Sequence, residues 1–154
     1  METISISPRK NWVFTNGAIV HSGVTVQGVR GPTAEHVYQA LKYSHDPEHQ
    51  QKILTASSPI VAKRLGSRRG GKPLTRSKIN KWKKSRIGVM RQCIYAKFED
   101  VSMRKALRQT KSKILIHDAF WDSFWSNGMN NEGQNMLGKI LMEVRQEIDI
   151  FADE

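Results

Sequence analysis

Three polar side chains share one face of a helix that the sequence predicts over residues 34–45. At 100° per residue, Glu35, Gln39 and Lys42 fall within a sector of roughly 60°. The apolar residues lie on a different side, which we expect to be the core face: Ala34, Val37, Tyr38 and Leu41. A carboxylate, an amide and an amine on one stripe are groups that can transfer protons or attack a sugar carbon. An ordinary solvent-exposed polar face is the alternative interpretation.

A second candidate lies in an aromatic loop over residues 117–134. Between Phe120 and Trp125 four of the six residues are aromatic, and Asp122 lies among them. So many aromatic side chains are costly to expose, so the loop either folds back on its own core or forms the wall of a binding site. In the second case a substrate ring stacks on Trp125, and Asp122 faces a developing positive charge.

Together these groups could cleave an N-glycosidic bond to ribose. Breaking that bond develops oxocarbenium character at the sugar. One carboxylate can then stabilise the sugar or activate water, while a second group protonates the leaving base. Lys42 could instead trap the opened sugar as a Schiff base. The sequence has no zinc or redox motif, so we expect neither a metal nor a cofactor.

The composition is that of a small basic domain. The 154 residues carry 25 Lys or Arg against 14 Asp or Glu, a formal net charge of +11, and 38% of them are hydrophobic. A chain of this length can bury a self-sufficient core. No apolar run approaches the ~18 residues of a membrane span, and no secretory signal is visible. Cys93 has no partner for an internal disulfide, and because it lies on the apolar stripe of its predicted helix we expect it in the core. We therefore expect a cytoplasmic protein without a membrane partner, and the oligomeric state stays open.

The positive charge is concentrated in one third of the chain. Residues 61–113 hold 18 Lys or Arg against only Glu99 and Asp100, a net charge of +16, whereas the remaining residues sum to −5. Such asymmetry is typical of a surface that meets phosphate, and +16 exceeds what solubility needs. A solvated basic face is the alternative.

Within this segment, a basic loop is predicted over residues 67–73. Its residues Arg68, Arg69 and Lys72 are our candidate contacts to nucleic acid. Residues 66–72 also have the spacing of a phosphate-binding P-loop, G-x-x-x-x-G-K. However, Pro73 stands where that motif needs the hydroxyl of Ser or Thr, so we exclude a P-loop.

The predicted elements give an α+β fold, mostly helical, with a few short strands. We expect a single compact domain over residues 1–154, with loose tails at 1–13 and 150–154. Helices are predicted over residues 34–45, 48–56, 59–65, 77–98, 102–109 and 135–151. A hairpin over residues 14–29, with its turn at 21–23, and a buried strand over 114–116 complete the prediction. A glycine inside a helix costs about 1 kcal/mol relative to Ala, so Gly138 predicts a close backbone approach to another helix or a ligand.

Five blocks of the sequence, in order, resemble the NADAR (YbiA-like) family. They are residues 32–42 (PTAEHVYQALK), 58–66 (SPIVAKRLG), the Trp82, Val89-Met90 and 96–98 (AKF) positions, 122–125 (DSFW) and 133–145 (GQNMLGKILMEVR). The resemblance implies a mostly helical single domain with N-glycosidase activity. Some members of that family hydrolyse riboflavin-pathway intermediates, releasing ribose 5-phosphate from a ribosylamino-pyrimidine. Others remove ADP-ribose from the amino group of guanine in nucleic acid, countering a DNA-modifying toxin.

The same resemblance implies roles for individual residues. Glu35 and Lys42 match the family's helix glutamate and lysine, and Asp122 joins them as the third expected catalytic residue. The expected substrate-binding residues are Asn16, Gln39, Trp82, Arg86, Trp125, Asn135 and Gly138. Asn16 comes from a Phe-Thr-Asn run similar to the family's Phe-Ser-Asn turn, although its spacing to Glu35 is longer here.

Two departures from the family pattern remove negative charge. His117 stands where a Glu is usual, and Lys83 stands where an acid is usual. With the +16 segment, they favour ADP-ribosylated guanine in nucleic acid as the substrate, because a single phosphate needs only one or two cations. The alternatives are hydrolysis of ribosylamino-pyrimidine phosphates, a non-catalytic reader of NAD-derived nucleotides, and a plain nucleic-acid-binding protein.

Overall fold

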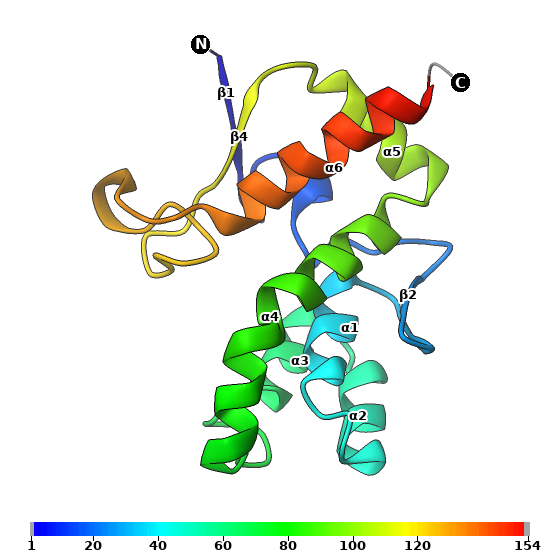
Figure 1. The fold of residues 1–154 in the computed structure, drawn as a ribbon, viewed down its shortest axis with the longest axis vertical. Coiled ribbons are helices and arrows are strands. Elements are labelled where there is room, and N and C mark those ends of the chain that lie inside the picture. Colours follow the sequence, from blue (N-terminus) through cyan, green and yellow to red (C-terminus); the bar gives the residue numbers. More distant parts are fainter. Residues whose placement is uncertain (1, 153–154) are drawn as a thin grey trace. The chain divides into compact units, whose positions relative to one another are not determined.

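The computed structural model describes residues 2–152, and Figure 1 shows their elements in chain order. The chain divides into two compact units. We call Ile19–Lys97 the central unit, and Met1–Ala18 with Phe98–Glu154 the terminal unit. Helices predominate over a few short strands, which confirms the predicted α+β class. That residues 1–154 form one domain stays a prediction.

The central unit is built around its first helix. Its elements are β2 (Val24–Val26), β3 (Val29–Gly31), α1 (Ala34–Leu41), α2 (Pro47–Leu54), α3 (Pro59–Leu65) and α4 (Arg76–Lys97). Helix α1 contacts α2, α3 and α4. The N-caps of α1, α2 and α3 are Thr33, Asp46 and Ser58. Each of these side chains accepts a hydrogen bond from the backbone N–H group of the residue three positions later.

The hairpin turns later in the chain than predicted. Val26 pairs with Val29 in the antiparallel β2–β3 ladder, so only Gln27 and Gly28 form the turn. Both have positive φ, 53° and 76°, as a two-residue hairpin turn of type I′ requires. A turn does form at the predicted residues 21–23, with Gly23 N donating to Val20 O at 2.8 Å, but it precedes β2, so its assignment as the turn of the hairpin was wrong.

The terminal unit joins the two ends of the chain. Its elements are β1 (Thr3–Ile6), the 3-10 turn η1 (Trp12–Phe14), α5 (Val101–Gln109), β4 (Ile114–His117), the 3-10 turn η2 (Met129–Asn131) and α6 (Met136–Ala152). β1 pairs in parallel with β4, and α6 packs against β4 and α5. The predicted loose tail at residues 1–13 was therefore wrong. Of the other predicted tail, residues 150–152 belong to α6, and residues 153–154 lie outside the described residues.

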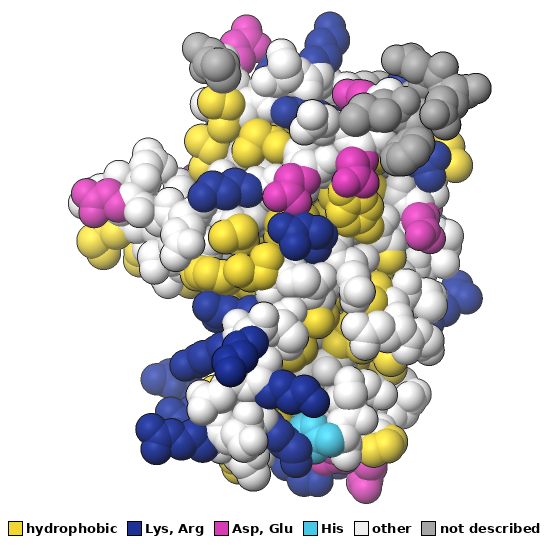
Figure 2. Space-filling model, viewed as in Figure 1, with side chains coloured by type: hydrophobic (Ala, Val, Ile, Leu, Met, Phe, Trp, Pro, Cys, Tyr) yellow, Lys and Arg dark blue, Asp and Glu magenta, His cyan; other side chains and the backbone are white. Residues whose placement is uncertain are grey.

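Helix α4 changes character along its length. The buried residues of α4 all lie in its second half and are Met90, Cys93, Ile94, Ala96 and Lys97. In the first half even the apolar Ile79 and Trp82 are only half-buried. Figure 2 shows Lys and Arg side chains gathered over this first half. The predicted burial of Cys93 is confirmed, and burial raises the pKa of its thiol to about 12, with a smaller contribution from Glu35.

Candidate active site

The predicted polar stripe of α1 is present, and two of its members, Glu35 and Gln39, are hydrogen-bonded to each other. Glu35 lies half-buried in the first turn, where the helix dipole favours a carboxylate. Gln39 Nε2 donates to Glu35 Oε1 at 2.9 Å. Gln39 is 7% exposed, so this stripe is no ordinary solvated face. The amide fixes one carboxylate oxygen of Glu35.

Lys42 ends this stripe at the C-cap of α1. Its Nζ donates to the backbone carbonyl of Gly66 at 2.7 Å. Burial lowers the pKa of Lys42, and the nearby Glu35 carboxylate opposes that shift. A lowered pKa increases the fraction of neutral amine, which is the form that can attack a carbonyl carbon.

Helix α4 brings an indole and a guanidinium to the same region. The rings of Tyr38 and Trp82 lie 5.1 Å apart, tilted by 55°. The pKa of Tyr38 is raised, first by burial and then by Glu35. Arg86 and a hydrogen bond from the Trp82 indole N–H oppose that rise. Five predicted residues, Glu35, Gln39, Lys42, Trp82 and Arg86, are therefore gathered within the central unit.

Tyr38 is a member of this cluster that the sequence argument assigned only to the core. Its ring is buried as predicted, but its hydroxyl interacts with Glu35, Trp82 and Arg86. The spacing of three residues from Glu35 was the available signal, because such residues are neighbours on a helix surface.

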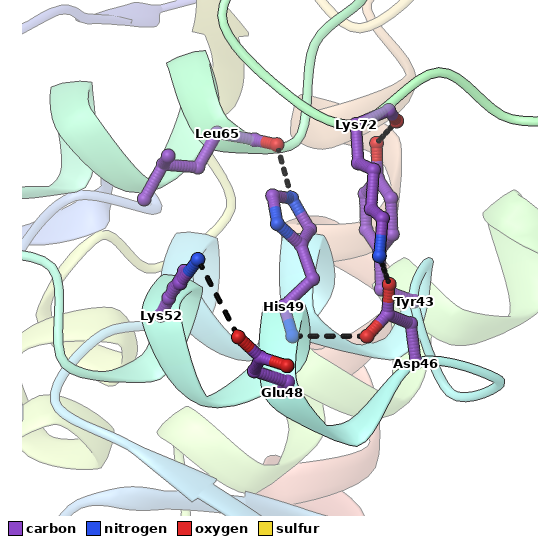
Figure 3. A network of polar contacts seen from close by, with 7 residues as sticks. All are labelled: Tyr43, Asp46, Glu48, His49, Lys52, Leu65 and Lys72. Carbon is purple, nitrogen blue, oxygen red and sulfur yellow. Dashed lines mark hydrogen bonds and ion pairs between the residues drawn. The ribbon is translucent and has the colours of Figure 1, made fainter.

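The loop that follows α3 is tied to the ends of α1 and α2 (Figure 3). His49 Nε2 donates to the carbonyl of Leu65 at 2.8 Å, and the Tyr43 hydroxyl donates to that of Lys72 at 2.7 Å. Lys72 Nζ pairs with Asp46 Oδ2 at 2.7 Å. The predicted flexible loop is thus anchored at both of its ends.

These anchors distinguish the three predicted nucleic-acid contacts. Arg68 and Arg69 are exposed between the anchored ends of the loop. Lys72 is exposed as well, but Asp46 already engages its ammonium group. The two arginines therefore offer their charge more freely than Lys72.

Five predicted residues lie in the terminal unit, and two of them, Asp122 and Asn135, form hydrogen bonds with backbone groups there. Asp122 Oδ1 accepts from the backbone N–H groups of Phe124 and Trp125, at 3.0 and 2.9 Å. Asn135 bonds to β4 on both sides, accepting from His117 N at 2.9 Å and donating to Leu115 O at 2.9 Å. Asp122 keeps a second oxygen beyond these two bonds, whereas both ends of the Asn135 amide are used.

Gly138 and Trp125 complete this group. A Cβ on Gly138 would overlap the carbonyl oxygen of Leu115, so the predicted close backbone approach is present, but the neighbour is the strand β4 and not another helix. Trp125 is half-buried against Phe124, at 4.7 Å between ring centroids. Phe120 and Trp121, in contrast, are 66% and 70% exposed. Asn16, the remaining predicted residue, is half-buried just after η1.

No group of three or more His, Cys, Asp or Glu side chains within residues 2–152 could hold a metal ion. No helix in that part of the chain is both long and apolar enough to cross a membrane.

Comparison with known proteins decides the family. A sequence model of the NADAR domain matches residues 5–149. The chain belongs to the NADAR family. The N-glycosidase YbiA of Shigella boydii is 37% identical over 128 residues, which are 82% of this chain and 76% of that protein. The solved NMR structure of Escherichia coli YbiA covers 100% of this NADAR chain and 90% of its own, with a TM-score of 0.79 and 33% identity.

A third relative of this NADAR chain has a different name. The chloroplastic riboflavin biosynthesis protein PYRR of Zea mays is 37% identical over 76% of this chain, which spans only 20% of the maize protein. The names of these relatives support a general N-glycosidase role, with a link to riboflavin chemistry.

Proposed function

We propose that this protein is an N-glycosidase that removes ADP-ribose from the amino group of guanine in nucleic acid. What supports this substrate is the direct connection between α1 and the basic loop. Lys42, on the polar stripe of Glu35, contacts Gly66, and Arg68 and Arg69 follow two and three residues later. A ribosyl group held at Glu35 would thus lie near cations able to meet a polynucleotide backbone.

In the proposed reaction, water replaces the guanine amino nitrogen at C1′ of the ribose. Glu35 is the carboxylate that stabilises the oxocarbenium-like sugar or takes a proton from the attacking water. Gln39 donates to one Glu35 oxygen and so orients the carboxylate. The leaving amine must gain a proton, which Asp122 or the Lys42 ammonium could give. That Asp122 and Glu35 act on one substrate is part of the proposal.

Lys42 has a second possible role. As a neutral amine it could attack C1′ of the ring-opened sugar and displace the guanine amino group, forming a Schiff base, which water would then hydrolyse to return the amine. The lowered pKa of Lys42 favours this role, and its contact with Gly66 favours a positioning role. Trapping with borohydride would distinguish the two, because only a Schiff base is reduced to a stable adduct.

The second candidate substrate is a ribosylamino-pyrimidine phosphate of the riboflavin pathway. The maize relative, which is named a riboflavin biosynthesis protein, favours it. The chemistry at C1′ is the same in both cases. The substrates differ in how many phosphates the protein must bind. The basic loop carries more cations than a single phosphate needs.

A turnover assay on both substrates tests the proposal. Intact protein is incubated with an oligonucleotide carrying ADP-ribosylated guanine, and separately with a ribosylamino-pyrimidine phosphate. We expect release of ADP-ribose from the oligonucleotide at the higher kcat/KM. Cleavage of the pyrimidine substrate alone would overturn the proposed substrate, although the protein would still be an N-glycosidase. Tight binding of ADP-ribosylated nucleotide without turnover would make the protein a reader. An erasing activity would also be consistent with an antitoxin role in the cytoplasm.

A further inference from the structure

Helix α4 carries three local features that destabilise an isolated helix. Arg76 and Lys78 lie in its first turn, where the helix dipole disfavours cations, and no acidic residue lies there. Lys78, Lys81 and Lys84 follow at intervals of three residues, which places like charges side by side. Gly88 interrupts the helix with the poorest helix former apart from proline.

None of these features is compensated within the described residues. Between Glu48 and Glu99 the sequence contains no Asp or Glu. No carboxylate in residues 2–152 forms an ion pair with Lys81 or Lys84. A Cβ on Gly88 would meet nothing within 4 Å, so no neighbour in the fold requires a glycine at this position.

The glycine and two of these lysines lie on one side of α4. Lys81, Lys84 and Gly88 have the spacing i, i+3 and i+7, which aligns them on a single face about 10.5 Å long. All three are exposed. Trp82 and Cys93 lie on the opposite face, so this strip points away from the core of the unit. Local rules broken together at an exposed site indicate a function there.

We propose that the outer face of α4 at Lys81, Lys84 and Gly88 is a docking strip for the phosphate backbone of nucleic acid. The inference deepens the proposed function and rests on it for the choice of partner. The lysines would pair with phosphates, and the missing side chain at Gly88 would let the backbone approach the helix closely. The strip is distinct from the Arg68–Arg69 loop and would extend contact along the polynucleotide.

Salt-dependent binding tests the two lysines. Binding of a labelled, unmodified duplex oligonucleotide is measured by fluorescence anisotropy for the wild type and for K81Q/K84Q. The control K10Q/K139Q removes the same charge from exposed sites in the terminal unit. Each phosphate contact contributes about 0.9 to the slope of log K against log salt. K81Q/K84Q should lower the slope by about 1.8, roughly a thirtyfold loss of affinity at 0.15 M salt, whereas the control should lower it by much less.

Two substitutions at Gly88 test the close approach. Gly88→Gln adds bulk without charge and should weaken binding at every salt concentration with the slope unchanged. Gly88→Ala should weaken binding less than Gly88→Gln does, because a methyl group adds less bulk to the strip. Wild-type binding by Gly88→Gln would overturn the role of the glycine.

The remaining outcomes separate this inference from the proposed function. Equal slopes for K81Q/K84Q and its control would overturn the strip. Preferential binding to anionic lipid vesicles over the oligonucleotide would also overturn it. If the slope changes as expected but no ADP-ribose is released, the strip stands and the proposed function fails. If ADP-ribose is released equally well by K81Q/K84Q, the function stands and the strip fails.

Discussion

Gly66 keeps the Gln39 amide against Glu35, and a single methyl group should break that arrangement. A Cβ on residue 66 would overlap the amide oxygen and amide carbon of Gln39, which is 7% exposed. Gly66 has a φ of −84°, so alanine meets no backbone strain there. Overpacking costs 1–3 kcal/mol and a hydrogen bond to a charged group contributes 1.5–3 kcal/mol, so we expect Gly66→Ala to lower the free energy of unfolding by about 2 kcal/mol.

A double-mutant cycle isolates this contact. In a Gln39→Ala background the amide is gone, and the nearest remaining atom to the added Cβ is the Cβ of residue 39 at 3.1 Å. The Gly66→Ala change should then cost less than about 0.5 kcal/mol, which gives a coupling energy of roughly 2 kcal/mol. Urea titrations followed by circular dichroism measure all four proteins, with constant m values confirming two-state unfolding.

The same titrations include a matched control. Gly88→Ala places a methyl group where nothing lies within 4 Å, so it should raise the free energy of unfolding by up to about 1 kcal/mol through helix propensity. If the losses from Gly66→Ala and Gln39→Ala simply add, the link from Gly66 through Gln39 to Glu35 is refuted.

Three further predictions concern the loop anchor, the thiol and the buried lysine. Asp46→Asn should speed tryptic cleavage at Arg68 because the loop loses its ion pair with Lys72, whereas Glu48→Gln, at an exposed pair with Lys52, should not. The raised pKa of Cys93 predicts slow labelling by a thiol reagent at pH 8 until the protein unfolds, and fast labelling of folded protein would contradict it. Burial lowers the pKa of Lys97 to about 7, so above pH 7 the unfolded chain holds a proton that the folded protein has released. The free energy of unfolding of the wild type, relative to that of Lys97→Met, should therefore rise with pH from 7 to 8.5. The urea midpoints of both proteins are measured across this range, and a constant difference between them would contradict the prediction.

Helices could be predicted here because each carries its own local signals. Pro47 and Pro59 mark the first turns of α2 and α3, behind capping residues, and α3 has the predicted bounds. Strand β1 could not be predicted. Its partner strand β4 begins at Ile114, far along the chain, and four residues are too few to show a clear alternation of apolar and polar side chains. The hairpin turn was misplaced because two glycine-containing turns stand close together in the sequence.

The site was predictable as a stripe but not as a set of contacts. Helix geometry placed Glu35, Gln39 and Lys42 together, which the structure bears out. It could not show that Gln39 is buried, because the loop at Gly66 covers it from another part of the chain. Nor could spacing reveal that Asp122 and Asn135 bind backbone groups. Short polar side chains make such bonds as readily as they bind ligands.

The rate of ADP-ribose release by Glu35→Gln tests the central claim most directly. Glutamine keeps an acceptor for the Gln39 amide but loses the charge. Initial rates on the ADP-ribosylated oligonucleotide are compared with those of the wild type and of Glu48→Gln, which removes an exposed carboxylate from α2. We predict a loss of roughly 10²-fold or more for Glu35→Gln, with oligonucleotide binding retained and Glu48→Gln unaffected. A wild-type rate for Glu35→Gln would contradict the account.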